Sequence, residues 1–279
     1  MTAFLRSING RRPRAAAGFS LIELAVVIAI IGLLLGSLMV PLQSQVESRK
    51  IADTQKILDN AREALIGFAA ANGYFPCPAD YGLVSAGAEA AHTVSTGVCL
   101  SSGAGRVDGG ATSGVYSGYL PAATLGFAPV DANGYAVDAW GGTKNRIRYA
   151  VSSTTVNSIT FPFTRTNGMS NALMSNILSA NLLSVCNTAT GSSNTACASA
   201  ATTLTSNAIT VIWSLGANAD TTGGTSTDEA ENAETRANAD RVFVMRDKSN
   251  VAATAFDDIV VWVSTPILFS RLLAAGRLP

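Results

Sequence analysis

The segment from Gly18 to Pro41, GFSLIELAVVIAIIGLLLGSLMVP, is apolar over almost its whole length. Its only charged residue is Glu23, and no charge follows from Leu24 to Val46. Leu24 to Leu42, about 19 residues, makes a helix of roughly 28 Å, which is long enough to cross a bilayer. A carboxylate beside such a span is costly, so its presence indicates a function. The segment therefore predicts a membrane helix with a functional glutamate near its start.

The charges before this segment predict its orientation. Residues 1–18 contain basic residues and no acid, which is typical of the cytoplasmic flank of a membrane helix. A secretory signal peptide is an alternative, but the apolar run is too long for one and no A-x-A site follows it. The basic residues are Arg6, Arg11, Arg12 and Arg14.

The rest of the chain is mildly acidic. When these four arginines are set aside, 15 of the 19 basic residues remain against 19 acidic residues. A general nucleic-acid-binding protein normally carries a basic surface. We therefore expect no nucleic acid among its partners.

The residues Gly18-Phe19-Ser20-Leu21-Ile22-Glu23 resemble the class III signal of type IV pilins and type II secretion pseudopilins. The resemblance implies that a prepilin peptidase cleaves between Gly18 and Phe19 and removes the basic leader, residues 1–18. It also implies that the apolar run is retained and that Phe19 is N-methylated. The partners implied are this peptidase, other pilin or pseudopilin subunits in a helical fibre, and an inner-membrane assembly platform.

The same resemblance gives Glu23 a physical role. When such helices bundle in a fibre, a buried carboxylate needs a counter-charge, and the amine of a neighbour's Phe19 can supply it. The pair would fix the axial register of the incoming subunit. Gly32 and Gly36 form a GxxxG pattern, which permits close helix packing. Pro41 is expected to interrupt the helix.

Beyond Pro41 the sequence becomes amphipathic. Apolar residues recur at helical spacing, and charged residues lie between them. Gly73 is expected to end the helix, and the prolines Pro76 and Pro78 prevent its continuation. We therefore expect one helix over residues 19–72, with about 19–42 in the membrane. Its expected apolar face contains Ile57, Leu58, Ala61, Leu65, Phe68 and Ala69.

Residues 73–279 are expected to form a globular head outside the cytoplasm. Short β-rich runs predict strands at 115–120, 146–151, 158–163, 208–215, 241–245 and 258–264. Helical spacing is present over 169–185, and a final helix is expected with Pro266 in its first turn and Gly276 as its stop. The expected fold is α+β and pilin-like, with an antiparallel sheet packed on the C-terminal half of the long helix.

Four cysteines, Cys77, Cys99, Cys186 and Cys197, form an even set in a chain with an export signal. They predict two disulfides and an oxidising compartment. Three pairings are possible, and proximity in sequence favours Cys77–Cys99 and Cys186–Cys197. The alternatives are buried thiols or a zinc site. Zinc is disfavoured because no pair has CxxC spacing and the only histidine, His92, lies in an Ala/Gly/Ser-rich loop.

Two stretches of the head resemble major pseudopilins. DAWGGTKNRIRYAV at 138–151 is similar to their Asp-x-Trp-Gly segment. SLGANADTTGGTSTDE at 214–229 and FDDIVVWVS at 256–264 are similar to their Gly/Asp-rich loop and closing strand. This resemblance implies a calcium ion with candidate ligands Asp220, Asp228, Asp257 and Asp258. The alternative is a solvated acidic loop that leads into a short helix capped at Thr227.

Motifs of enzymes are missing from the sequence. The single histidine leaves little room for a Ser-His-Asp triad, and there is no G-x-S-x-G, H-E-x-x-H or Walker A pattern. GAGRVDGG at 103–110 lacks the spacing of a dinucleotide loop. We therefore expect a structural subunit and not an enzyme.

The head is larger than that of a typical major pseudopilin because of long Gly/Ser/Thr-rich insertions at about 80–125 and 150–207. Such loops suit an exposed face better than a repeated interface. We therefore expect a minor, low-copy subunit that waits in the inner membrane with its head in the periplasm and then joins a pilus or pseudopilus. The alternative is a surface-binding protein, an adhesin or DNA-uptake receptor, that uses the helix only as an anchor.

Overall fold

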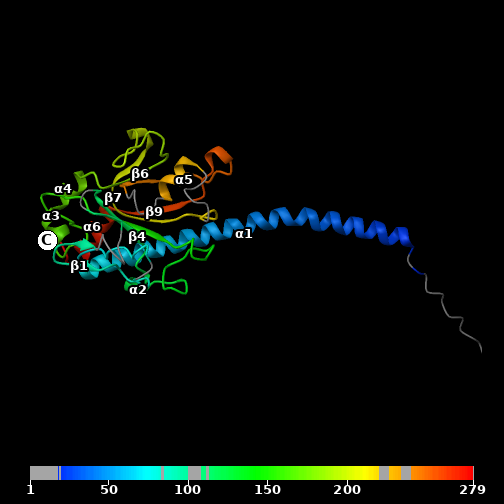
Figure 1. Cartoon of the computed structure of the whole chain (residues 1–279), viewed down its shortest axis with the longest axis horizontal. Coiled ribbons are helices and arrows are strands. Elements are labelled where there is room, and N and C mark those ends of the chain that lie inside the picture. The colour runs from blue at the N-terminus through cyan, green and yellow to red at the C-terminus, as the bar shows by residue number, and fades with distance from the viewer. Residues whose placement is uncertain are drawn as a thin grey trace, which may run out of the picture. The chain divides into compact units, whose positions relative to one another are not determined.

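The structure is a computed structural model that describes residues 18, 20–82, 85–99, 108–110, 113–219, 226–233 and 240–278 (Figure 1). The chain forms two compact units, Met1–Ser48 and Arg49–Pro279. The first unit contributes the beginning of helix α1, and the second contains the rest of α1 and the head. Each unit is described by itself.

Helix α1 runs from Leu21 to Asn72. It starts where the carbonyl of Ser20 accepts hydrogen bonds from the amides of Glu23 and Leu24. It ends as predicted at Gly73, whose positive φ of 81° lets its amide reach the carbonyl of Ala69. The predicted interruption at Pro41 is wrong, because α1 continues through this residue. A proline removes one hydrogen bond but keeps a helical φ, so the turns on either side can persist.

In the first unit, apolar side chains are exposed all around α1. Their exposed fractions range from 43% at Val27 to 87% at Leu21. Within the described part of the chain, no helix combines the length and apolarity that crossing a membrane requires.

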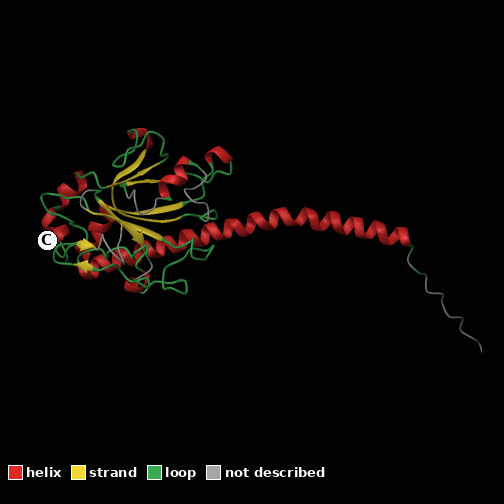
Figure 2. Ribbon diagram, in the orientation of Figure 1, coloured by secondary structure: helices red, strands yellow, loops and turns green. Residues whose placement is uncertain are grey.

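The head contains a seven-stranded sheet with the order β3-β4-β5-β7-β6-β8 and with β9 also paired to β7 (Figure 2). Every pair is antiparallel except β6 and β8, which are parallel, so the expected all-antiparallel sheet is corrected to a mixed one. The strands are β3 Asp108–Gly110, β4 Val115–Tyr119, β5 Arg148–Ser152, β6 Leu183–Cys186, β7 Thr203–Ser214, β8 Val242–Val244 and β9 Ile259–Ser264.

Strand β7 organises the sheet because β5 and β6 pair with different parts of one of its edges, and β9 pairs with the other edge. Thr210–Trp213 lies between β5 and β9, whereas Thr203–Ala208 pairs with β6. Register shifts separate these two parts of β7, and bulges of this kind bend a strand. A separate two-stranded sheet pairs β1, His92–Thr93, with β2, Val98–Cys99.

One face of the sheet packs against the part of α1 that belongs to the head. Leu58, Ala61, Leu65 and Ala69 are fully buried, at the spacing of one helix face. Alternate strand residues meet them, as the two-residue period of a strand requires. These include Tyr116, Tyr149, Val151, Ile212, Val261 and Val263. This is the predicted α+β, pilin-like arrangement of a long helix on a sheet.

The opposite face carries a second apolar cluster that includes Val211, Trp213 and Phe243. Helix α5, Thr227–Asn232, is joined to this face through Asn232, which is 1% exposed. The side-chain amide of Asn232 donates to the carbonyl of Val244 and accepts from its amide, both at 2.8 Å. The backbone carbonyl of Asn232 accepts from the indole of Trp213 at 2.9 Å. Asn232 therefore acts as an additional strand residue beside β8.

The remaining helices are short. The C-terminal helix α6, Thr265–Ala274, has Pro266 in its first turn and ends before Gly276, as predicted. Beyond it, Arg277 donates to the carbonyls of Ala70 and Ala71 at the end of α1. The others are α2 Ala122–Leu125, α3 Gly168–Ala172, α4 Met174–Ser179 and the 3₁₀ helices η1 Ala200–Thr202 and η2 Ala252–Thr254.

Three predicted elements differ from the structure. Residues 158–163 form turns and not a strand, because Phe161 has a φ of 50° and Pro162 has no amide to donate. The helical spacing over 169–185 is divided between α3, α4 and β6. The N-cap of α5 is Ser226, whose hydroxyl accepts from the amide of Glu229, and not Thr227.

The regions that the sequence marks as insertions belong partly to the core. Residues 80–125 include β4 with the buried Tyr116, and residues 150–207 include the buried Phe163, Ile177 and Val185. The large head is therefore one packed body and not a small core with added loops.

We expect Asn232→Ala to lower the free energy of unfolding of the head by roughly 3 kcal/mol, because it leaves buried partners at Val244 and Asp258 unsatisfied. Denaturant unfolding of the detergent-solubilised chain, followed by tryptophan fluorescence, measures this loss. The matched control is Asn171→Ala on the exposed surface of α3, which should change the free energy by at most about 0.5 kcal/mol. Equal effects of the two variants would contradict the role of Asn232.

Candidate functional site

The N-terminal motif lies at the start of α1. Gly18 is exposed before the helix, whereas Phe19 lies outside the described residues. Glu23 is in the first turn, where the helix dipole favours a negative charge, and its side chain is exposed. A Cβ added at Gly32 would meet no atom within 4 Å, so this position leaves room for close approach. Gly36 and Pro41 follow in the same helix.

Glu23 and Gly32 lie on opposite sides of α1. They are nine residues apart, and at about 100° per residue this separation turns roughly 180° around the helix axis. Gly36 is four residues beyond Gly32 and shares its side. The carboxylate and the two glycines therefore present two different faces to any neighbours.

In the head, the segment that begins DAWGG forms a turn around Asp138, which is 3% exposed. Its carboxylate accepts hydrogen bonds from the amides of Trp140 and Gly141 and from the side chains of Asn145 and Ser214. Burial nevertheless raises the pKa of Asp138 above its usual value. The Asp-x-Trp-Gly segment is thus fastened to the end of β7.

The second motif meets the first at the same corner. Asn145 donates to the carbonyl of Gly216 at 2.6 Å. The next two amides, of Ala217 and Asn218, both donate to the carboxylate of Asp257. Burial raises the pKa of Asp257 to about 6, and burial also raises the pKa of Asp258 well above its usual value. The two stretches singled out in the sequence therefore form one polar corner of the head.

Asp228 has a structural role that the sequence did not reveal. One of its carboxylate oxygens accepts from the amide of Ala189 and the hydroxyl of Thr188, and the other is paired with Arg246. It thereby ties α5 to the loop after β6 and to the segment after β8. Both of its carboxylate oxygens therefore already have strong partners, and its role as a calcium ligand stays a prediction.

The other calcium candidates stay predictions as well. Asp220 lies outside the described residues. Asp257 and Asp258 do not join any group of three side chains that could hold a metal ion among the residues that the structure describes. Glu229, which the sequence analysis missed, lies close by and accepts from the side chain of Asn218. Glu229 and Asn232 are three residues apart on α5 and therefore lie on the same side of this helix. This spacing is the signal in the sequence that could have indicated Glu229.

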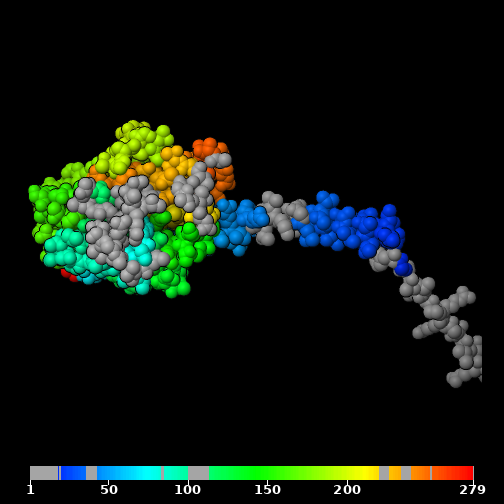
Figure 3. All heavy atoms as spheres, viewed as in Figure 1, coloured from blue at the N-terminus to red at the C-terminus, as the bar shows by residue number. Residues whose placement is uncertain are grey.

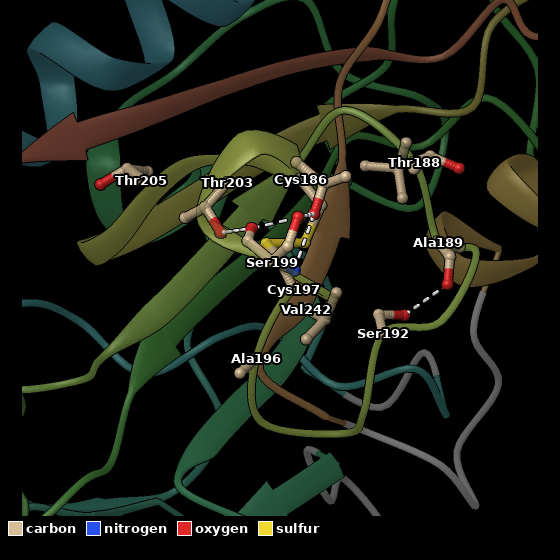
Figure 4. The surroundings of a disulfide bond; sticks show 12 residues. Cys186, Thr188, Ala189, Ser192, Ala196, Cys197, Ser199, Thr203, Thr205 and Val242 are labelled. Atoms are coloured by element: carbon tan, nitrogen blue, oxygen red, sulfur yellow. Dashed lines mark hydrogen bonds between the residues drawn. A yellow bond between two sulfur atoms is a disulfide. The ribbon is translucent and has the colours of Figure 1, made fainter.

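The structure pairs Cys77 with Cys99 and Cys186 with Cys197. The second bond closes a Ser/Thr-rich loop in which Ser192 donates to the carbonyl of Ala189 (Figure 4). This loop lies on the surface of the head, in yellow-green at the top of Figure 3. Through Asp228 it is also connected to α5.

Glu231 in α5 and Asp240 after this helix form a pair of carboxyl groups. Burial raises the pKa of Glu231 to about 7, and the charge of Asp240 is the next cause. Burial also raises the pKa of Asp240 to about 6. The two carboxyl groups therefore interact, and Asp240 disfavours the ionised form of Glu231.

Comparison with known proteins identifies the N-terminal segment. Residues 13–39 match the family model described as the prokaryotic N-terminal methylation motif, the class III prepilin signal of type IV pilins and pseudopilins. The chain therefore carries a prepilin-type signal, and the resemblance at Gly18–Glu23 is confirmed. The chain matches no curated protein and no solved structure.

The pair of Glu231 and Asp240 predicts that its own contribution to the stability of the head is smaller at neutral than at acidic pH. Both folded pKa values lie above their ordinary values of 4.5 and 3.8, so the stabilisation is complete below about pH 4 and is lost as the pH rises through 6 to 7. Glu231→Gln cannot titrate and can still donate to Asp240. We expect it to raise Tm by roughly 2–4 °C at pH 7.5, as about 1 kcal/mol does for a domain of this size, and to leave Tm unchanged at pH 4.

Thermal unfolding followed by circular dichroism at the two pH values tests this prediction. Glu63→Gln serves as the control, because Glu63 is an exposed residue of α1 whose ion pair with Arg271 is open to solvent. A Glu231→Gln variant with the same Tm as the unmodified chain at pH 7.5 would show that the pair does not carry the pH dependence.

Proposed function

We propose that the chain is a prepilin-like structural subunit that is cleaved between Gly18 and Phe19 and then assembles into a type IV pilus or a type II secretion pseudopilus. The observation that carries this proposal is the methylation motif at residues 13–39. It includes the beginning of α1, where the apolar side chains are exposed on all sides. A prepilin peptidase, other pilin subunits and an inner-membrane assembly platform are the partners that this function requires.

The exposed apolar surface of α1 supports storage in a membrane before assembly. Apolar surface in water costs about 25 cal/mol per Å², so a helix that is apolar all around must be covered. Lipid covers it in the waiting subunit, as a single-pass inner-membrane helix over about 19–42 with the head in the periplasm. Neighbouring helices then cover it in the fibre.

The two faces of α1 support different contacts in that fibre. On one face, Glu23 pairs with the N-terminal amine of Phe19 in a neighbouring subunit and sets the axial register. On the opposite face, Gly32 and Gly36 allow another helix to approach closely. Each subunit therefore meets two different neighbours through two different surfaces.

We further propose that the subunit occurs in low copy, at the tip or sparsely along a fibre of a smaller pilin. The size of the head and its disulfide-closed surface loop at 186–197 support this position. The second candidate is a surface-binding protein, an adhesin or a DNA-uptake receptor, in which α1 serves only as an anchor. The same exposed loop favours this second candidate, but an anchored surface protein gives Glu23 no role.

Processing is the first test. Intact-mass analysis of protein extracted from membranes should show a chain that begins at an N-methylated Phe19. Gly18→Leu should block the cut, because the peptidase recognises the glycine before the apolar run, whereas Gly32→Leu inside the helix should leave it intact. A chain that begins at Met1, or after Leu42, would rule out prepilin-type processing.

Assembly depends on Glu23 if the proposal is correct. Glu23→Leu should still be inserted and cleaved, because a more apolar span inserts more readily. It should be lost from sheared fibres, because the neighbour's amine then lacks its partner. Asp53→Asn, an exposed acid elsewhere on α1, is the control and should be incorporated normally.

Quantitative mass spectrometry of the same fibres measures both incorporation and copy number. Normal incorporation of Glu23→Leu would contradict the register role of Glu23, whereas absence of the unmodified chain from the fibres would favour the anchored surface protein. If this chain is the most abundant component of the fibre, the low-copy position is wrong and the head forms the repeating surface.

A further inference from the structure

Beside the end of α1, four potential metal ligands lie together around the Cys77–Cys99 disulfide. The ligand atoms of Cys77, Glu89 and His92 are all within 4.8 Å of one another. Cys99 is bonded to Cys77 and is paired directly with His92 between β1 and β2. Cysteine spacing alone could not show this group, because its members are separated in sequence and only the two-stranded sheet unites them.

The surroundings of His92 are those of a ligand whose ring is held in place. Its Nε2 lies 2.7 Å from the carbonyl oxygen of Thr164, which can only accept, so Nε2 donates a proton there. A metal-binding histidine commonly donates its second nitrogen to a backbone carbonyl in this way. The other nitrogen, Nδ1, lies 3.2 Å from the carboxylate of Glu89. The same Glu89 oxygen accepts from the amide of Cys77 at 3.0 Å.

Nδ1 and the Glu89 oxygen are both acceptors when the imidazole is neutral, so a proton or a cation must lie between them. The pair is also largely shielded from water, with the side chain of His92 4% exposed and that of Glu89 25% exposed. Both cysteines are fully buried. Two thiolates added to this imidazole and carboxylate would make a complete ligand set.

We propose that Cys77 and Cys99, when reduced, form with His92 and Glu89 a tetrahedral site for a zinc-class divalent cation, and that formation of the disulfide expels this cation. Two thiolates, one imidazole and one carboxylate are ligands that zinc accepts. Bond lengths of about 2.0–2.3 Å place the ligand atoms of such a site roughly 3.3–3.8 Å apart. Cys77, Glu89 and His92 therefore need only a contraction from distances within 4.8 Å, whereas the sulfur of Cys99 has to separate from that of Cys77 and turn toward the other ligands.

The scaffold of the site does not depend on the disulfide. Thr164 donates from its hydroxyl to the carbonyl of Gly97 at 2.6 Å, and the amide of Thr166 donates to Val94 at 3.0 Å. The amide of Phe75 donates to the carbonyl of Phe163 at 2.7 Å. These bonds hold both strands of the small sheet and the end of α1 against one segment. The ligands thus remain close when the sulfur–sulfur bond is absent.

The two states interconvert in a balanced reaction. An external disulfide, such as oxidised glutathione, takes two electrons from the two zinc-bound thiolates and two protons from solvent and leaves as two thiols. Cys77 and Cys99 become joined, and Zn²⁺ is released. The reverse requires a dithiol or phosphine reductant. The metal would hold the small sheet closed in a newly made chain until oxidation replaces it with a covalent bond.

Cobalt(II) is the probe for the test, because tetrahedral thiolate coordination gives it intense visible bands and a sulfur-to-metal band in the near ultraviolet. The full chain is solubilised in detergent, reduced with a phosphine and titrated with Co²⁺ and then Zn²⁺. We expect one Co²⁺ per reduced chain, displacement by Zn²⁺, and no such spectrum from the oxidised chain. Oxidised glutathione should then release one Zn²⁺ for each disulfide formed.

Variants distinguish this site from adventitious binding by thiols. Cys186→Ser/Cys197→Ser keeps the proposed site and should bind Co²⁺ as the unmodified chain does, whereas Cys77→Ser/Cys99→Ser should not. His92→Ala should weaken binding at least tenfold, since even the loss of a residue that only orients a ligand costs about 10–100-fold. Tryptophan fluorescence of each reduced sample shows whether the head is folded.

The proposal fails if the folded, reduced chain takes up no Co²⁺. It also fails if His92→Ala binds Co²⁺ as tightly as the unmodified chain, because free thiols alone would then account for binding. If the reduced chain is unfolded, the thiols of Cys186 and Cys197 should bind Co²⁺ as well as those of Cys77 and Cys99. Equal binding of Co²⁺ by the two double variants would therefore overturn the site.

Discussion

The packing of one face of α1 against the sheet is the contact on which the rest of the head depends. One apolar cluster joins Tyr149 and Ile212 of the sheet to the α1 residues Leu58, Ala61, Leu65 and Ala69. The side chains that alternate to the other face of the sheet form the second cluster, so both faces are buried. The same helix changes character along its length. In the head unit only one side of α1 is buried, whereas in the first unit the described apolar side chains are exposed all around the helix. One element thus serves both a folded head and a contact that must be supplied from outside the chain.

The elements with a strong local pattern could be predicted from the sequence. The end of α1 at Gly73, the strands that contain Val211 and Val261, and the C-terminal helix at Pro266 all have side chains whose period or backbone preference matches their structure. The strand β6 could not be predicted, because Leu183–Cys186 follows two short helices and is buried on both sides. Its parallel partner β8 lies far away in sequence, and no local pattern specifies such a pairing.

The processing motif could be recognised because its residues are consecutive, whereas the polar corner of the head could be predicted only in part. The two stretches that meet there were singled out, but the roles of Asp138, Asp228 and Asn232 depend on partners that the fold supplies. An aspartate that pairs with an arginine and one that binds a metal ion look the same in a sequence. The group at His92 was missed for the same reason, since it exists only when β1 and β2 are paired.

The opposite placement of Glu23 and Gly32 on α1 has a consequence for symmetry. A contact that joins one face of a helix to a different face of its neighbour is heterologous, so it cannot be satisfied by a closed pair of identical subunits. Unless the rotation between neighbours closes a ring, each added copy offers the same free face again and the assembly continues as an open screw. The proposed fibre would then have a direction and no intrinsic length, and its size would be decided by the supply of subunits and not by their geometry.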